Sequence, residues 1–408
     1  MALKQGRTAR ALKLLRNGEL DFQLMRALSA ATEGGATVGE CLLVRDQAGS
    51  PEAFARAWFA LAARTEQRAN AALEAGHQQT GLERLKRATN YYKSALTNFS
   101  PIAHAEEHRE SWASGTRTFE RFGSLLATPM ARIDVPFEGG VLPCYWLRPD
   151  STAKPAPSLM AFTGGEGSAM EMYFWIGAAG ARRGYNVFLC EIPGNVGAMY
   201  RNDLRATLRP DTEKPIGAII DHIAQLPGID PKRIAATGYS YGGYFAARAA
   251  CFDSRIAALI PDTPLRNGFE LWYAVMPRWF MNSRLGPELL NWVATTLLRR
   301  ANRNSVDLVL WLKQAENMLP MIEFTRQCNL TGLESQIKCP VLALDGDGEG
   351  EIFNRQAKEF FDAVGSQRKQ MVSFLSADGG GAHCQVDNYS LLQEVTYDWL
   401  DEVFGAAP

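Results

Sequence analysis

The segment best suited to chemistry is a serine inside a glycine-rich turn. Residues 238–243 have the sequence GYSYGG, which places Ser240 in a G-x-S-x-G motif. An apolar run precedes the motif and a helix-favouring run follows it, so we expect the serine on a sharp turn between a strand and a helix. There the helix dipole would favour negative charge that develops near the hydroxyl. The motif in this context predicts a nucleophile; the alternative is a glycine-rich turn without chemistry.

A serine hydroxyl needs a neighbouring base before it becomes a good nucleophile. Of the five histidines, four fall in segments with helical patterns: His77, His104, His108 and His222. His383 lies instead in the glycine-rich loop SADGGGAHCQVDN, between the last predicted strand and the last predicted helix. Since a loop at the carboxyl edge of a sheet can reach the serine, we expect His383 to be the base. The alternative is a loop histidine that bonds only locally.

An acid that orients the base is expected between the serine and the histidine in chain order. The segment VLALDGDGEGEIF supplies several acids directly after a predicted strand. In the usual G-x-x-acid register, counted from Gly346, the acid is Glu349. Asp347 is the second choice, and Asp262, which ends the preceding predicted strand, is the third. The acid would hold the imidazole tautomer and stabilise the imidazolium.

Two backbone N–H groups must also face the charge that develops on a substrate oxygen. One is expected from Tyr241, the residue after the nucleophile. The other is expected from the loop GGEGSAMEM, where Gly164 and Gly165 allow a close approach and Gly165 or Glu166 offers the N–H. The alternative for this loop is a tight turn that binds nothing.

Two regions of different character must position these residues. Residues 1–128 are predicted to be helical, and residues 129–408 alternate strands with helices after an opening hairpin. The strands are short and continuously apolar: SLMAFT, YNVFLC, RIAATG, AALIPD and VLALD, with a weaker MVSFL. Such strands, separated by helices, are typical of an α/β fold with a mostly parallel sheet covered on both faces.

A long helical stretch interrupts the second region at about residues 264–336. It is too long for a simple connection, so we interpret it as an inserted cap; the alternative is a set of extra helices on the sheet edge. The cap is rich in aromatic and methionine side chains. With Tyr239, we expect part of this set to line a substrate pocket: Trp272, Tyr273 and Met276. Equally, these side chains could only pack the cap.

The composition limits the partners of the chain. Forty-three basic and 44 acidic residues nearly cancel, which gives no support to nucleic acid or a charged membrane surface as a partner. No apolar run reaches the roughly 18–20 residues of a membrane span, and no signal-peptide pattern opens the chain. Seven scattered cysteines without a C-x-x-C pair are typical of reduced thiols in a cytoplasmic protein. No cofactor or metal is predicted, because the calcium-like loop from Asp345 has Gln356 at its twelfth position.

Together these features resemble the α/β-hydrolase superfamily over residues 130 to 408. A closer likeness is to 2,6-dihydroxypseudooxynicotine hydrolase and the fungal heptaketide hydrolases, carried by RATNYYKSA, GGEGSAMEM, EIPGNVG and GAHCQ. The resemblance implies a helical N-terminal lid and a Ser-acid-His triad in a deep pocket between core and lid. It also implies cleavage of a carbon–carbon bond next to a ketone in an aromatic or polyketide-like molecule, often by a homodimer.

The chain departs from these families at several positions. Glu349 and Glu191 stand where aspartate is usual, the cap is longer, and Glu270 is only a nearby candidate for an auxiliary glutamate. We therefore expect a hydrolase that acts on a carbonyl compound. The alternatives are an esterase, a lactonase or an acyltransferase on a small acyl substrate, and a non-hydrolytic cyclase or binding protein with the same fold.

Overall fold

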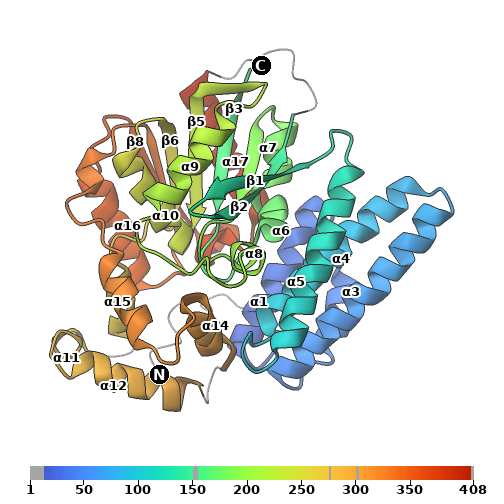
Figure 1. The fold of residues 1–408 in the computed structure, drawn as a ribbon, viewed down its shortest axis with the longest axis horizontal. Coiled ribbons are helices and arrows are strands. Elements are labelled where there is room, and N and C mark those ends of the chain that lie inside the picture. The colour runs from blue at the N-terminus through green and yellow to red at the C-terminus, as the bar shows by residue number, and fades with distance from the viewer. Residues whose placement is uncertain (1–12, 150–154, 275–276, 300–302, 406–408) are drawn as a thin grey trace.

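An eight-stranded sheet forms the centre of the region that begins at residue 131 (Figure 1). The computed structural model describes residues 13–149, 155–274, 277–299 and 303–405. The strand order is β1-β2-β4-β3-β5-β6-β7-β8. The strands are β1 (Ala131–Phe137), β2 (Gly140–Leu147), β3 (Ala156–Phe162), β4 (Asn186–Cys190), β5 (Ile229–Tyr239), β6 (Ile256–Asp262), β7 (Val341–Gly346) and β8 (Lys369–Phe374).

The hairpin β1–β2 joins β4 in antiparallel pairing, and all pairs from β4 to β8 are parallel. The predicted fold class, an α/β-hydrolase fold with a mostly parallel sheet, is confirmed. Because the carboxyl ends of parallel strands meet at one edge, the segments after β3, β5, β6 and β7 lie together. This edge positions the predicted site residues.

The central strands bury side chains on both faces, which explains their continuous apolar sequences. In β3, Leu159 and Ala161 join one hydrophobic cluster, while Met160 and Phe162 join another. Successive side chains of a strand point to opposite faces, so each face has its own core. The helices α7 (Ala178–Arg182) and α17 (Tyr389–Phe404) contribute to the first cluster, and α9 (Glu213–Ile223) and α10 (Tyr241–Phe252) to the second.

The N-terminal helices stand beside the sheet as a group (Figure 1). They are α1 (Gly18–Ser29), α2 (Val38–Arg45), α3 (Pro51–Glu74), α4 (Gln78–Asn98) and α5 (Ala105–Ser124). Ser50 caps α3, since its Oγ accepts from Ala53 N at 3.1 Å, and Pro51 begins the helix. Phe122 of α5 packs on the ring of Tyr173, with centroids 4.8 Å apart, and so joins this group to the sheet region.

The long segment between β6 and β7 forms further helices: α11 (Arg278–Met281), α12 (Gly286–Val293), α14 (Arg303–Lys313) and α15 (Leu319–Gln327). Helix α16 (Glu351–Ala363) follows β7. Helix α14 lies toward the N-terminal helices (Figure 1). Its Asp307 accepts a hydrogen bond from the Ser100 hydroxyl, and its Asn304 donates to Asn98 O. Among the described residues, no helix is both long and apolar enough to cross a membrane.

Candidate active site

Ser240 occupies a sharp turn between β5 and α10. Its φ is 59° and its ψ is −123°, a conformation that residues other than glycine rarely adopt. Ser240 N donates to Asp262 O at 2.6 Å, and Gly243 N donates to Ser240 O at 2.8 Å. A Cβ on Gly238 would lie 1.9 Å from Gly242 O, so strand and helix cross too closely for a side chain there. The local geometry is the strand–turn–helix that the motif predicts.

His383 and Glu349 lie together in two loops at the same edge of the sheet. The His383 Nδ1 is 3.4 Å from the Glu349 Oε2, and both side chains are buried. The carboxylate also accepts hydrogen bonds from Cys384 N at 2.9 Å and from the Thr263 hydroxyl. These contacts hold Glu349 in a fixed position behind the imidazole.

The two other candidate acids have different surroundings. Asp347 is exposed, and its carboxylate accepts from Ser376 N at 2.8 Å and from the Ser376 hydroxyl. Asp262 is fully buried, and burial together with the Glu349 and Asp345 carboxylates raises its pKa well above the usual range. Glu349 Oε2 lies 3.4 Å from His383 Nδ1, so the geometry favours Glu349 as the partner of His383.

A small cavity of about 30 Å³ joins the nucleophile, the histidine and the predicted oxyanion loop. Ser240, Tyr239 and His383 line it, as do Gly165 and Glu166. The loop packs directly on the turn, since a Cβ on Gly164 would lie 3.3 Å from both Ser240 Cβ and Tyr241 N. Tyr241 is the first residue of α10, and an N–H in the first turn has no partner within its own helix.

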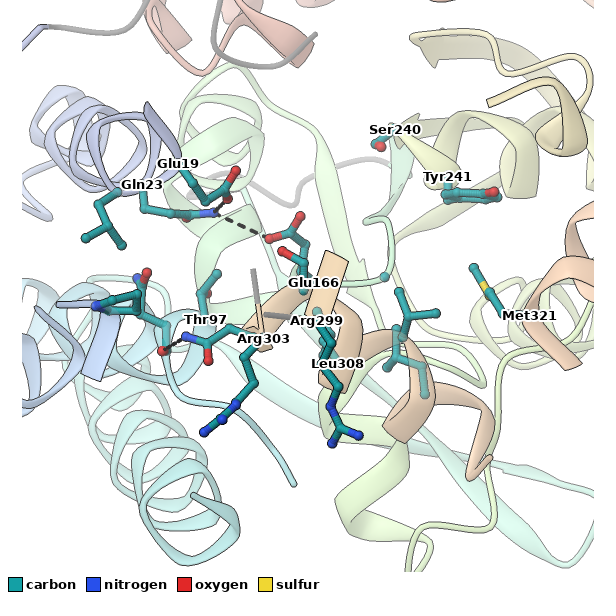
Figure 2. Close-up of a pocket in the computed structure, with 18 of the residues that line it drawn as sticks. Glu19, Gln23, Thr97, Glu166, Ser240, Tyr241, Arg299, Arg303, Leu308 and Met321 are labelled. Atoms are coloured by element: carbon teal, nitrogen blue, oxygen red, sulfur yellow. Dashed lines mark hydrogen bonds between the residues drawn. The ribbon is translucent and has the colours of Figure 1, made fainter. Parts of the chain in front are cut away.

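A second cavity, of about 590 Å³, opens on the other side of Ser240. Figure 2 shows Ser240 and Tyr241 on one wall and Arg299 and Arg303 on the far side, with Glu166 between the two groups. Apolar residues from distant segments complete the walls. They are Leu20 from α1; Leu208, which precedes α9; Leu308, Val309 and Leu312 from α14; and Met321 from α15. A cavity of this size and mixed lining suits a small organic molecule.

The predicted pocket aromatics of the cap do not line either cavity among the described residues. Trp272 Nε1 donates to Thr325 Oγ1 at 2.8 Å, and Tyr273 packs edge-on against Phe269 with ring centroids 6.0 Å apart. Both therefore pack the cap, which was the alternative expectation. Met276 lies outside the described residues.

Sequence reasoning missed the walls that α1 and α14 provide. Leu308 and Leu312 are four residues apart, so they lie on one face of α14. That spacing is the one signal in the sequence that could have pointed to this wall. No comparable local pattern connects α1 with a serine that follows it by two hundred residues.

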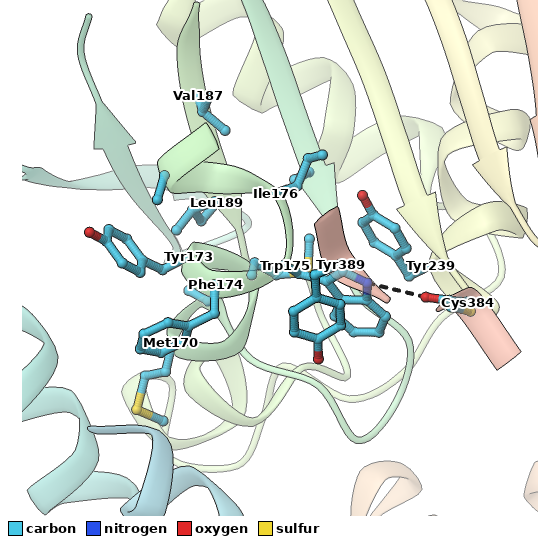
Figure 3. Close-up of a cluster of buried hydrophobic side chains, with 14 of the residues drawn as sticks. Met170, Tyr173, Phe174, Trp175, Ile176, Val187, Leu189, Tyr239, Cys384 and Tyr389 are labelled. Atoms are coloured by element: carbon cyan, nitrogen blue, oxygen red, sulfur yellow. Dashed lines mark hydrogen bonds between the residues drawn. The ribbon is translucent and has the colours of Figure 1, made fainter. Parts of the chain in front are cut away.

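Tyr239 belongs to a buried aromatic stack beneath the site. Its ring lies 4.6 Å from that of Trp175, which in turn lies 5.4 Å from that of Tyr389 (Figure 3). Trp175 Nε1 donates to Cys384 O at 3.2 Å, so the stack holds the residue next to His383. Burial raises the pKa of Tyr239 well above the usual range, and the phenol stays neutral.

One group among the described residues has the ligand types of a metal site. A carboxylate oxygen of Glu349, a ring nitrogen of His383 and the Cys384 Sγ lie within 4.8 Å of one another. These types suit zinc, but the Glu349 oxygens already accept hydrogen bonds from Cys384 N and Thr263. A metal would have to displace these bonds, so the geometry favours a histidine–carboxylate pair.

Comparison with known proteins gives the family. Hydrolase LUC6 from Fusarium sp is 31% identical over 418 residues, which are 94% of this chain and 96% of the relative. The chain belongs to the α/β-hydrolase family. The model of the prolyl oligopeptidase family matches residues 170–281, a span that contains the β5–Ser240–α10 turn. The enzyme is therefore a hydrolase, and the predicted resemblance is confirmed.

Other relatives cover the chain from end to end. The 20-hydroxy-prefusarin hydrolase FUS2 of Gibberella moniliformis is 28% identical over 422 residues, 96% of this chain and 98% of the relative. The crystal structure of the 2,6-dihydroxy-pseudo-oxynicotine hydrolase matches with a TM-score of 0.70 and 20% identity, over 93% of this chain and 95% of that one. AbyA5 matches with a TM-score of 0.65 and 18% identity, over 97% and 96%. At these identities the solved structures support the fold.

Proposed function

We propose that this α/β hydrolase is a serine hydrolase in which Ser240, His383 and Glu349 form the catalytic triad. The observation that carries the proposal is the shared small cavity: Ser240 and His383 both line it, and Glu349 Oε2 lies 3.4 Å from His383 Nδ1. An order of serine, acid and histidine along the chain is the one expected for this fold.

In the proposed reaction, His383 takes the proton of Ser240 as Oγ attacks a substrate carbonyl. The Tyr241 N–H, with the N–H of Gly165 or Glu166, stabilises the negative charge on the carbonyl oxygen. The protonated His383 then gives its proton to the leaving group, and an acyl group stays on Ser240. Water releases the acid and restores the serine.

For the substrate, we propose a carbon–carbon bond next to a ketone in an aromatic or polyketide-like molecule. The leaving group would then be a carbanion, so the substrate must delocalise that charge, as a polyhydroxylated ring or a β-diketone does. Support comes from the cavity of about 590 Å³ beside Ser240, whose lining combines apolar side chains with polar and charged ones, as an oxygenated aromatic molecule requires. Further support comes from a relative that is named as a 20-hydroxy-prefusarin hydrolase.

A fluorophosphonate probe tests the nucleophile, because it labels serines that a base activates. We expect labelling of the wild type and none of Ser240→Ala. The matched control is Ser335→Ala, an exposed serine on the turn Glu334–Gln336, which should be labelled as the wild type is. A folded wild type that stays unlabelled would contradict the proposal and favour a cyclase or binding protein.

A second comparison tests the bond that is cleaved. Turnover of p-nitrophenyl acyl esters is measured beside turnover of acylated polyhydroxy-aromatics. Release of the aromatic fragment from the second class supports the carbon–carbon reaction, whereas turnover of simple esters alone supports an esterase, a lactonase or an acyltransferase. The homodimer and the cytoplasmic location stay predictions, for which light scattering and cell fractionation are the measurements.

A further inference from the structure

The small cavity beside Ser240 is large enough for an ordered water molecule. It measures about 30 Å³, above the roughly 10–15 Å³ that a cavity needs to hold one water. It is too small for an acyl chain, whereas the cavity of about 590 Å³ can hold one. Ser240 lines both cavities and so stands between a large compartment and a water-sized one.

The walls of the small cavity carry the polar groups that an ordered water needs. Such a water makes two to four hydrogen bonds as a rule. The buried ring of His383 is one wall, and its Nε2 makes no hydrogen bond to another described residue. Arg26, from α1, lines another wall, and Glu166 lines a third; both side chains end in polar groups. These groups can donate to, and accept from, the same molecule.

Arg26 is held in place from behind by a buried charge network. Its Nε and Nη2 both donate to the Glu171 carboxylate, the latter at 2.5 Å, and Lys93 Nζ donates to the same carboxylate at 2.6 Å. The Arg26 Nη1 faces Glu166 Oε2 at 3.5 Å, longer than an ordinary hydrogen bond. Glu171 thus fixes Nε and Nη2 of the guanidinium, while Nη1 points toward Glu166, which also lines the cavity.

We propose that the small cavity is the site of the hydrolytic water, and that Arg26 together with Glu166 positions this water for attack on acylated Ser240. The proposal rests on the proposed serine-hydrolase function. In the step, the water oxygen attacks the ester carbonyl and His383 Nε2 takes the water proton. The bond from the carbonyl carbon to Ser240 Oγ then breaks, Oγ regains the proton from His383, and a carboxylic acid leaves.

This assignment separates the two halves of the reaction. Acylation needs the large cavity, the serine, the histidine and the oxyanion N–H groups, but no water. Deacylation needs the water as well, so a change at Arg26 should slow the second half alone. A role of Arg26 in holding the oxyanion loop would slow both halves, since both pass through an oxyanion.

The test uses the full chain and p-nitrophenyl acetate, with the burst of p-nitrophenol reporting acylation and the steady state reporting deacylation. For Arg26→Lys we expect a steady-state rate roughly tenfold to a hundredfold lower, because a small displacement of a reactant has that effect. The burst rate should change by less than about twofold. Intact-mass spectrometry should find acetyl-Ser240 accumulating in the variant.

Two further variants complete the test. Glu166→Gln alters a partly exposed side chain of the same cavity and should also slow the steady state selectively, which covers the case that Arg26→Lys fails to fold. Arg182→Lys is the matched control: Arg182, in α7, donates to both carboxylate oxygens of Glu33, in the turn that follows α1, and lines neither cavity. It should retain both rates.

The outcomes distinguish a failure of the water site from a failure of the proposed serine-hydrolase function. Equal loss of burst and steady state, or no change in either, overturns the water site while the serine mechanism stands. A wild type in which Ser240 takes up no acetyl group contradicts the proposed function, and the water site falls with it.

Discussion

At the scale of single residues, the candidate site consists of a serine with a strained backbone, Ser240, and the buried pair of His383 and Glu349. A non-glycine residue with the φ of Ser240 costs about 1–3 kcal/mol, and such strain persists only where the surroundings enforce it. Here the bonds from Ser240 N to Asp262 O and from Gly243 N to Ser240 O enforce it. Ser240 lines both cavities, and the Glu349 carboxylate lies 3.4 Å from the ring of His383.

The role of Glu349 leads to a prediction at this scale. Glu349→Gln keeps the shape of the side chain but removes the charge that would stabilise a protonated His383. We expect the kcat/KM for ester substrates to fall roughly 10³-fold to 10⁴-fold. Asp347→Asn removes a charge two residues away that contacts Ser376, and it should change kcat/KM by less than about twofold. The opposite ranking of the two variants would make Asp347 the acid.

Much of this residue-scale picture could be predicted from the sequence, because the signals are local. The G-x-S-x-G spacing and its flanking runs predict the turn, and the register after Gly346 points to Glu349. Arg26 gave no such signal. Its contact with Glu171 joins residues 145 positions apart, and only the folded chain brings them together.

At the scale of elements, the loop between β3 and α6 (Ala169–Met172) is held from below. Asn195 Nδ2 donates to Gly164 O at 3.1 Å, and Ala169 N donates to Glu191 Oε1 at 2.9 Å. Both partners come from the segment after β4. The departure from aspartate at position 191 thus places a longer side chain under the loop that packs on Ser240.

Because Glu191 accepts a hydrogen bond from the start of α6, its titration should make the stability of the protein depend on pH. Burial raises the pKa of Glu191 from 4.5 to about 7. Its contribution to stability is therefore fully present below pH 4.5 and is lost as the pH rises through 7, where the folded state must hold a buried charge. The lost free energy of unfolding is about 3 kcal/mol.

The measurement is urea unfolding at several pH values between 4.5 and 7. The free energy of unfolding of the wild type, relative to that of Glu191→Gln, should decline across this window. An exposed glutamate, Glu402, provides the control, since Glu402→Gln should follow the wild type at every pH. Parallel curves for wild type and Glu191→Gln would show that the carboxyl does not titrate there.

The sequence predicted the strands, which depend on short local patterns. It did not predict the walls of the large cavity, because several distant elements build them. Each predicted apolar run falls in a strand, because burial on both faces of the central strands demands continuous apolar residues. The run in β8 is weaker, and that strand is only partly buried. The aromatic content of the cap suggested Trp272 and Tyr273 as pocket walls, but a large aromatic side chain packs a helix against its neighbours just as well. Composition alone cannot distinguish the two.

At the scale of the whole molecule, the large cavity is shared among three parts of the chain. The turn at Ser240 provides one wall, α14 provides a second, and the N-terminal helices provide the third through α1, the start of α3 and the end of α4. The contacts of Ser100 with Asp307 and of Asn98 with Asn304 join the second and third parts. Sequence distance hides this arrangement, because no periodicity relates α1, α14 and the turn.

Filling the cavity should change the size of molecule that the enzyme accepts. Leu308→Trp adds a bulky ring to the α14 wall, away from the small cavity. We expect the KM for bulky aromatic substrates to rise at least about tenfold, with labelling of Ser240 by a small fluorophosphonate unchanged. Leu297→Trp, at an exposed position outside both cavities, is the control. A wild-type KM for Leu308→Trp would mean that substrates bind elsewhere.

The position of α14 bears on how enzymes of this kind diversify. The helix lines the large cavity only, and it belongs to a segment that enters and leaves the sheet between β6 and β7. Substitutions there can reshape what is admitted without moving the serine turn, the histidine loop or the Glu349 carboxylate. A lineage can thus acquire new substrates by drift in one insertion while its chemical machinery is inherited intact.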